Sequence, residues 1–202
     1  GIFLAGFSHH SDASKYGVEH IAATGLMNPA ALSSNPFELE VLRAEYDRAN
    51  AGLAMSPVPV RAGWGRTRFL IGLGSYLTNS VGGCIDCHTS PTYDTGGDPF
   101  RGQKEKINTK NYLAGGARFG PFTSRNLTPD PANGNRPAGL SLDEFLDVMQ
   151  KGTDFKKLHP QISPLLQVMP WPAYSKMTER DLTAIYYYLS AIPHADPAPA
   201  AN

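Results

Sequence analysis

The sequence predicts an all-α fold in which short helices and long ordered loops surround a large cofactor. Apolar residues recur with helical spacing in three segments, and two of these segments begin at residues typical of helix caps. The chain has 20 glycines and 17 prolines among 202 residues, which predicts unusually long loops for a helical protein. Such loops need a surface to pack on, and a large flat cofactor would supply it.

The first of the three helices is expected from Thr67 to Asn79, with Gly72 at a point where a second helix can approach closely. The second begins at a Ser141–Glu144 capping box and ends at Gly152. The last begins near Thr178 and stops at Pro193. Their expected inner faces are Phe69, Leu73, Tyr76 and Leu77; Leu142, Phe145, Leu146 and Met149; and Leu182, Ile185, Tyr186, Leu189 and Ile192.

Three regions follow from this pattern: an N-terminal extension over residues 1–62, a helical domain over 63–194 and a disordered tail over 195–202. The extension contains a short helix that starts at Asn35, with Pro36 at its first position and Glu38 closing a capping box. Phe37, Val41 and Leu42 give this helix an apolar stripe, and Ser56–Val60 is expected to be an extended linker. The extension either binds a partner or packs on the domain.

The charge balance excludes one class of partner. Lys and Arg total 18, as do Asp and Glu, whereas nucleic-acid binding usually needs a basic excess. No apolar run reaches eighteen residues, and the apolar start of the chain lacks the features of a signal peptide. We therefore expect a mature product, or one trimmed from an anchored precursor, that meets a membrane only through partners or a removed anchor.

The two cysteines of the chain lie in the motif Cys84-Ile85-Asp86-Cys87-His88. This C-x-x-C-H spacing is typical of covalent haem c attachment, because two thiols on one helical turn can reach two vinyl groups and the following imidazole can bind iron. A thioredoxin-like pair would need a preceding β-strand, and a zinc site would need about four ligands. A disulfide would leave His88 unexplained. The motif predicts one haem with His88 as an iron ligand.

The second iron ligand is predicted to be Met169, which precedes Pro170-Trp171-Pro172 and lies shortly before the last helix. A loop stiffened by proline can hold a thioether against iron. His159 is the most serious rival. Each other methionine has a simpler explanation: Met149 fits a helical core, Met177 precedes a cap, and Met27 and Met55 lie in the extension.

Residues 65–194 resemble a class I cytochrome c domain, most closely the cytochrome subunits of bacterial membrane-bound alcohol and aldehyde dehydrogenases. The matching stretches are Cys84–Thr89, Leu113–Gly116, Ser124–Asp130, Met169–Tyr174 and Asp181–Leu189. Those subunits usually carry three attachment motifs, whereas this chain has one. The resemblance implies that the first and last helices cross with a glycine and an aromatic at the contact, roles that Gly72, Tyr76 and Tyr188 would fill.

The resemblance implies transfer of single electrons in the bacterial periplasm, with no catalysis by the chain itself. The partners would be a dehydrogenase, an oxidase or another cytochrome, within a larger complex. Arg125 and Asn126 are candidates to bind a haem propionate, and Trp171 either packs on the ring or braces the loop. The alternative functions are a haem enzyme or gas sensor with a displaceable ligand, and a structural subunit of a larger complex.

Overall fold

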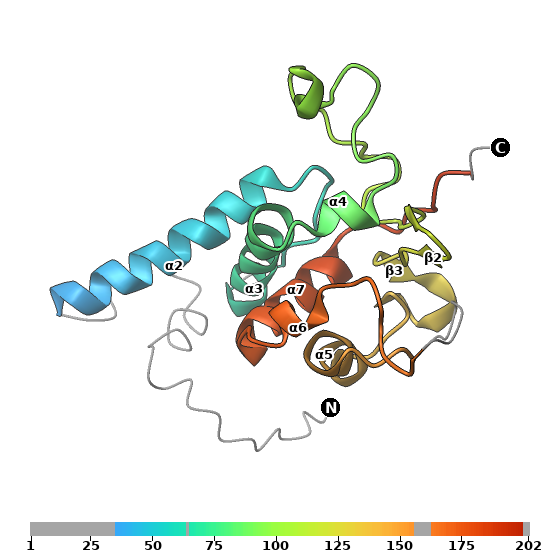
Figure 1. The fold of residues 1–202 in the computed structure, drawn as a ribbon. Helices are drawn as coiled ribbons and strands as arrows, with labels where there is room; N and C mark the ends of the chain where they lie inside the picture. The colour runs from blue at the N-terminus through green and yellow to red at the C-terminus, as the bar shows by residue number, and fades with distance from the viewer. Residues whose placement is uncertain (1–34, 64, 156–162, 200–202) are drawn as a thin grey trace.

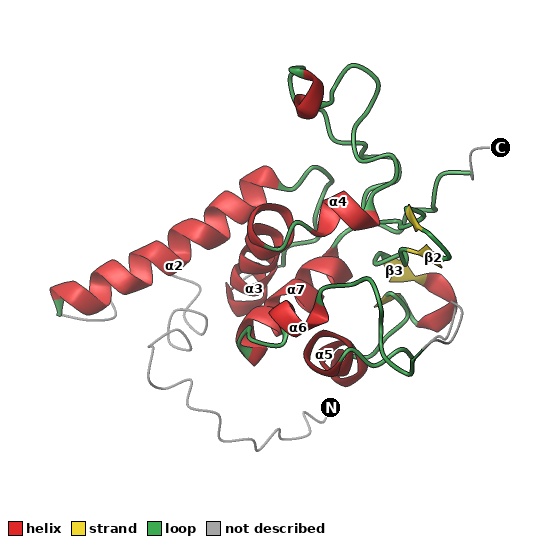
Figure 2. Ribbon diagram, in the orientation of Figure 1, coloured by secondary structure: helices red, strands yellow, loops and turns green. Residues whose placement is uncertain are grey.

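The computed structural model describes residues 35–63, 65–155 and 163–199 and shows a predominantly helical fold with a few two-residue strands (Figures 1 and 2). The longer helices gather on one side of the molecule, and the strands lie on the other. In chain order the helices are α2 (Pro36–Met55), α3 (Gly65–Tyr76), the π-helical turn η3 (Leu77–Val81), α4 (Cys84–His88), the 3₁₀ turns η4 (Pro99–Arg101) and η5 (Pro131–Asn133), α5 (Leu142–Lys151), α6 (Trp171–Tyr174) and α7 (Glu179–Ala191).

Two short antiparallel pairs complete the described elements. Strand β1 (Arg118–Phe119) pairs with β2 (Phe122–Thr123), and β3 (Pro129–Asp130) pairs with β4 (Arg136–Pro137). Both pairs fall in the long segment between α4 and α5, where the sequence predicts loops. These strands turn the segment back on itself and bring Ser124 and Arg125 beside α4.

The crossing of α3 and α7 forms the centre of the core, as the resemblance implies, but the glycine at the contact is Gly74. A Cβ atom on Gly74 would lie 1.9 Å from the carbonyl oxygen of Ala184 and 2.8 Å from Cβ of Tyr188. The expectation for Gly72 was wrong, because Gly72 meets α2 instead, where a Cβ would lie 2.2 Å from the Ala49 oxygen. Tyr188 of α7 is fully buried at the contact with α3, as expected.

Helix α2 packs along α3 through its C-terminal half. A Cβ on Gly52 would lie 1.9 Å from the Gly72 oxygen, so the two backbones touch at this point. The expected stripe is only partly correct: Leu42 is buried, whereas Phe37 is 73% and Val41 40% exposed. α2 is also longer than expected, and its N-terminal half projects away from the other helices (Figure 1).

The segment Ser56–Val60 is not a free linker. Val58 is buried in the main core, and the Ser56 hydroxyl lies 2.9 Å from the Tyr188 hydroxyl. Just beyond it, the Arg61 amide donates to the Ala191 oxygen at 3.0 Å. The described end of the extension therefore packs against the last helix.

Local signals identified the ends of the helices well. Asn35 caps α2 by accepting from the Phe37 amide, and Thr178 caps α7 by accepting from the Asp181 amide. Ser141 and Glu144 form the predicted capping box of α5. The first helix was predicted to reach Asn79, but α3 ends at Tyr76 and continues as η3, in which the Asn79 side chain donates to the Ser75 oxygen.

The first residues of the expected disordered tail are held by hydrogen bonds. The Asn126 side chain donates to the Ala195 oxygen at 2.7 Å, and the Asn111 side chain donates to the Asp196 oxygen at 2.8 Å. These bonds anchor the first residues of the tail to the long loop segment. Residues 200–202 and the region 1–34, which includes Met27, lie outside the described residues.

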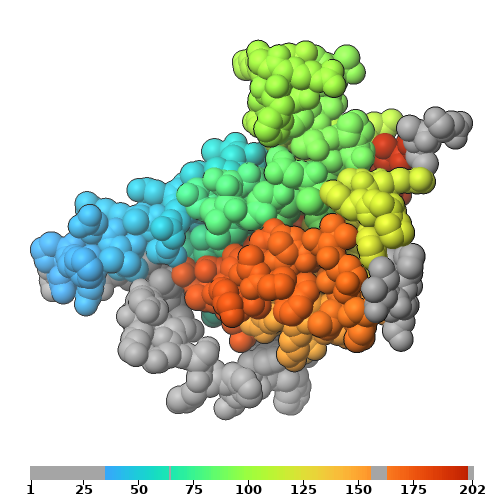
Figure 3. All heavy atoms as spheres, in the orientation of Figure 1, coloured from blue at the N-terminus to red at the C-terminus, as the bar shows by residue number. Residues whose placement is uncertain are grey.

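One part of the long segment stands away from the body as a projection (Figures 1 and 3). We call residues 93–107 the finger. Its ends are paired through Tyr93 and Ile107, and the Asp94 amide donates to the Lys106 oxygen at 2.9 Å. Phe100 in its 3₁₀ turn is 88% exposed. The finger starts five residues after α4, so it projects from beside the haem-attachment motif.

Candidate haem-attachment site

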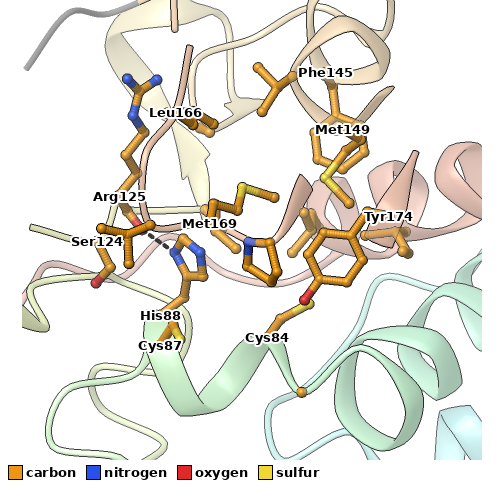
Figure 4. A pocket seen from close by; sticks show the side chains of 18 of the residues that line it. Cys84, Cys87, His88, Ser124, Arg125, Phe145, Met149, Leu166, Met169 and Tyr174 are labelled. Carbon is orange, nitrogen blue, oxygen red and sulfur yellow. Dashed lines mark hydrogen bonds between the residues drawn. The ribbon is translucent and has the colours of Figure 1, made fainter. Parts of the chain in front are cut away.

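A largely apolar cavity opens between α4, α5, α7 and the β1–β2 hairpin (Figure 4). The space between these elements, counted out to the open mouth of the cavity, is about 1170 Å³. The apolar side chains on its walls include Phe119, Phe122, Leu127, Leu140, Phe145, Val148, Leu166, Ile185 and Leu189. Both cysteines and His88 also line it.

The attachment motif occupies the single turn of α4, which places Cys84 and Cys87 on one wall of the cavity. Both are free thiols, so the structure contains no disulfide between them. Burial raises the pKa of the Cys84 thiol to about 12, and burial with the nearby Asp86 carboxylate raises that of Cys87. Both thiols are therefore protonated at neutral pH.

The structure does not support two alternative interpretations of the Cys84–His88 motif, a thioredoxin-like redox pair and a zinc site. The preceding segment is the helix α3 with the η3 turn, whereas a thioredoxin-like pair follows a strand. No group of three or more His, Cys, Asp or Glu side chains gathers to hold a metal ion in the described parts of the chain. A zinc site with about four protein ligands would need such a group.

His88 is fixed by one hydrogen bond to the backbone. Its Nδ1 lies 2.8 Å from the carbonyl oxygen of Arg125, so Nε2 is the ring nitrogen left for a ligand in the cavity. Burial lowers the pKa of His88, with the Arg125 carbonyl opposing this shift and the Arg125 charge adding to it. The imidazole is therefore neutral, which is the form that binds iron.

Gly115 explains how Arg125 comes so close to α4. Its backbone has φ of +78°, and a Cβ there would lie 2.4 Å from the carbonyl carbon of Arg125. The Gly115 amide also donates to the His88 oxygen at 2.7 Å. Only glycine allows the Arg125 segment and the end of α4 to meet at this residue.

The Arg125 side chain lies on the cavity wall and is ion-paired with Asp154. Its Nε is buried and has no hydrogen-bond partner among the described residues. A buried unpaired donor is costly, so this atom fits an anionic group such as a propionate in the cavity. The sequence had no signal for Asp154, which lies 29 residues from Arg125.

The side chain of Asn126 makes its described hydrogen bonds away from the cavity, and its role at a propionate stays a prediction. Its side chain donates to the Ala195 oxygen and accepts from both the amide and the hydroxyl of Thr128, at 2.7–2.8 Å. Asn126 is also absent from the described cavity wall. It braces the loop against the C-terminal segment, because a side-chain amide engaged on both ends has little left for a ligand.

Trp171 also lies outside the described cavity wall. Its ring covers Gly152, where a Cβ would lie 2.4 Å from the ring, and its Nε1 donates to the Leu166 oxygen at 3.2 Å. These contacts favour the role in which Trp171 braces the loop, and contact with a haem ring stays a prediction. Tyr174, which the sequence analysis missed, does line the cavity and donates to the Gly82 oxygen at 2.9 Å.

Two methionines, Met169 and Met149, face the cavity (Figure 4). Met169 lies in the loop before α6, and Met149 projects from α5 with 4% of its surface exposed. Met55 and Met177 are not on the described wall, and His159 lies outside the described residues. Thus the structure brings Met169 to the same cavity as His88 and adds Met149 as a rival that the sequence analysis assigned to the core.

The residues present fit a covalently attached haem. Two thiols lie on one turn, a neutral imidazole is fixed through Nδ1, and thioethers and an unpaired Arg125 donor face the same apolar space. This donor set is the arrangement of a c-type cytochrome site. The individual assignments of Cys84, Cys87, His88 and Met169 to the haem stay predictions.

Comparison with known proteins supports the same class. The chain is 29% identical over 123 residues to the cytochrome c subunit of a quinone alcohol dehydrogenase from Gluconacetobacter polyoxogenes. It is 29% identical over 119 residues to the cytochrome c subunit of a gluconate 2-dehydrogenase from Pantoea cypripedii. Each match covers 59% of this chain, and the resemblance to cytochrome c subunits of bacterial dehydrogenases is thereby confirmed.

The matches cover only part of those relatives. The chain spans 21% of the alcohol dehydrogenase subunit and 22% of the gluconate dehydrogenase subunit, so about a fifth of each. No family model matches the chain, and no solved structure matches it. Among the described helices, none is both long and apolar enough to cross a membrane.

Proposed function

We propose that this chain is a monohaem c-type cytochrome that transfers single electrons between redox proteins and is a subunit or partner of a dehydrogenase complex in the bacterial periplasm. The observation that carries the proposal is the cavity itself, where the Cys84–His88 turn, a fixed neutral imidazole and a thioether meet. The relatives, which are named as cytochrome c subunits of dehydrogenases, support the partner class.

Haem c, when attached, supplies an iron that accepts and releases one electron. The residues of the chain set the conditions for this. Cys84 and Cys87 would bind the porphyrin edge, the His88 Nε2 would bind iron, and the apolar walls would exclude water and lower the local dielectric constant. Arg125 offers its Nε to a propionate.

Met169 is the proposed second iron ligand. It lies on a loop that Pro170 stiffens directly after it, and such a loop can hold a thioether against iron, whereas Met149 belongs to α5 and is buried in the main core. Two filled axial positions favour electron transfer over catalysis on iron. Ligation by methionine and histidine together also raises the reduction potential.

The attachment is tested by haem staining of the denatured chain after expression with a cytochrome c maturation system. Stain that stays with the polypeptide, and a pyridine haemochrome spectrum typical of two thioether links, are expected. Cys84→Ala and Cys87→Ala should each impair attachment, and Ser80→Ala, at an exposed residue of η3, is the matched control. Loss of all haem on denaturation of the unmodified chain refutes the proposal.

The ligand assignment is tested by a pair of methionine variants. Met169→His should abolish the weak far-red sulfur-to-iron band of the oxidised protein and lower its potential, because a thioether is replaced by imidazole. Met149→Leu, which nearly conserves volume, should keep the band. The opposite result assigns the ligand to Met149.

Carbon monoxide separates the proposal from the alternative of a haem enzyme or gas sensor. With both axial positions filled, the spectrum of the reduced protein should be unchanged by carbon monoxide. A rapid shift of the main absorption band would show a displaceable ligand and favour the alternative.

A further inference from the structure

Two segments that are separated in the chain run side by side just before Met169. The Leu166 amide donates to the Gly152 oxygen at 2.8 Å, and Thr153 forms an antiparallel bridge with Leu165. Met169 follows Leu166 by three residues. The position of this methionine is thus linked to residues 152–154, which leave the C-terminus of α5.

Apart from this pairing, the Met169 loop is held by the packing of Leu166 and Met169 against buried core residues, and most of its other described residues are exposed. Pro164, Leu165, Gln167 and Val168 are all exposed. Side-chain bonds of the loop are mostly internal, such as that from the Gln167 side chain to the Leu165 oxygen. The exception is the bond from Trp171 to the Leu166 oxygen. Among the described contacts, the pairing with residues 152–154 is therefore the backbone connection that joins this loop to the end of α5.

Asp154 also connects the segment 152–154 to His88, the other proposed iron ligand. Its carboxylate is ion-paired with Arg125, and the two side chains are only 5% and 12% exposed. The carbonyl of that same Arg125 accepts the hydrogen bond from His88. Arg125 therefore bonds to His88 through its backbone carbonyl (Figure 4). Its guanidinium bonds to Asp154, which lies in the segment that pairs with the loop before Met169.

We propose that the Arg125–Asp154 ion pair is a clasp that closes the haem cavity, with Asp154 as a positioning residue that keeps the Met169 thioether on the iron. The two charges are almost fully buried, and separating them would break a buried ion pair, so the pair disfavours separation of its two segments. The inference rests on the proposed function, since it concerns the ligands of that site.

The test measures how readily imidazole displaces the native ligand in the full-length, oxidised haem protein. Imidazole binds only when the Met169 loop leaves the iron, so its apparent affinity reports the fraction of open molecules. Asp154→Asn should bind imidazole about tenfold more tightly than the unmodified protein, because a weakened clasp raises the open fraction. Arg125→Gln removes the same ion pair from the other side and should give a similar increase.

Two controls isolate the clasp from general destabilisation. Asp147→Asn breaks an ion pair with Lys151 on α5 whose side chains are 40% and 66% exposed, and it should leave imidazole affinity unchanged. Tyr112→Phe removes a buried hydroxyl that bonds to Tyr188 away from the cavity wall, so it lowers stability without opening the loop. The double variant of Asp154 and Arg125 should bind imidazole no more tightly than either single variant, because the two residues act as one unit.

The outcomes distinguish this inference from the proposed function. If the unmodified protein lacks covalent haem or the far-red band, the proposed function or its ligand assignment fails. If those features are present and both single variants bind imidazole as the unmodified protein does, the clasp is wrong and the proposed function stands. The clasp would also be wrong if the increases in imidazole affinity of the two single variants added up in the double variant.

Discussion

Substitution of Gly74 by alanine tests the helix crossing at the centre of the fold. In an exposed helix this change stabilises a protein by about 0.5–1 kcal/mol, because glycine loses more backbone entropy on folding. Here the new Cβ would lie 1.9 Å from the Ala184 oxygen and 2.5 Å from its carbonyl carbon. Both are backbone atoms and cannot rotate away, so α3 and α7 must separate by roughly 1 Å to restore an ordinary contact.

Overpacking of this kind costs about 1–3 kcal/mol, and more where backbone must move, so we expect a net loss of about 2 kcal/mol or more. The assay is guanidinium unfolding of the haem protein, followed by both far-ultraviolet circular dichroism and haem absorption. Thr67→Ala, at an exposed residue of the same helix, is the control and should change stability by less than about 0.5 kcal/mol. An unchanged or higher midpoint for Gly74→Ala would refute the close contact of α3 with α7.

Three further results are expected. Burial is the main cause that raises the pKa of Tyr112 above its ordinary value, so this tyrosine stabilises the fold below pH of about 10 and the stability is lost as the pH rises further. The guanidinium midpoint of Tyr112→Phe should therefore fall less steeply above pH 10 than that of the unmodified protein. Equal slopes for the two proteins would contradict the raised pKa of Tyr112. Trp171→Phe should lower the free energy of unfolding by about 1 kcal/mol, since it loses the bond to the Leu166 oxygen, and unchanged urea midpoints would argue against that bond. Phe100→Ser should change thermal stability by less than about 0.5 kcal/mol because Phe100 is 88% exposed, and a large drop in the melting temperature would mean that the ring is buried.

The sequence predicted those features that depend on a few neighbouring residues. The capping residues Asn35, Ser141 and Thr178 act within three positions of themselves, so their roles could be inferred without the fold. The haem-attachment motif is local in the same sense. Its cysteines and His88 share one turn in the structure, as their spacing requires.

The features that were missed concern side chains whose partners lie far along the chain. Gly72 and Gly74 are both in α3, and spacing alone does not tell which of them meets α7 and which meets α2. Asn126 has a suitable side chain for a propionate, but Ala195, 69 residues away, accepts its hydrogen bond. Phe37 and Val41 have helical spacing with Leu42, yet they are 73% and 40% exposed while Leu42 is buried.

The candidate site was predicted in part for the same reason. Met169 was recognised from the prolines around it, whereas the access of Met149 to the cavity depends on how α5 is rotated. The partnership of Arg125 with Asp154 depends on the pairing of residues 152–154 with the loop before Met169. That pairing joins segments with no periodic pattern, so single-sequence reasoning has no signal for it.

The finger is a position at which additional residues can be inserted into the chain. Its two ends are already tied together, by the Tyr93–Ile107 bridge and by the Asn108 amide, which donates to the Thr92 oxygen at 3.1 Å. Because the entropy of closing a loop grows only slowly with its length, residues between these ends can be exchanged at little thermodynamic cost to the rest. The segment is thus a graft position beside the Cys84–His88 turn, where peptide tags or spectroscopic labels can be carried close to the proposed haem site without entering the core.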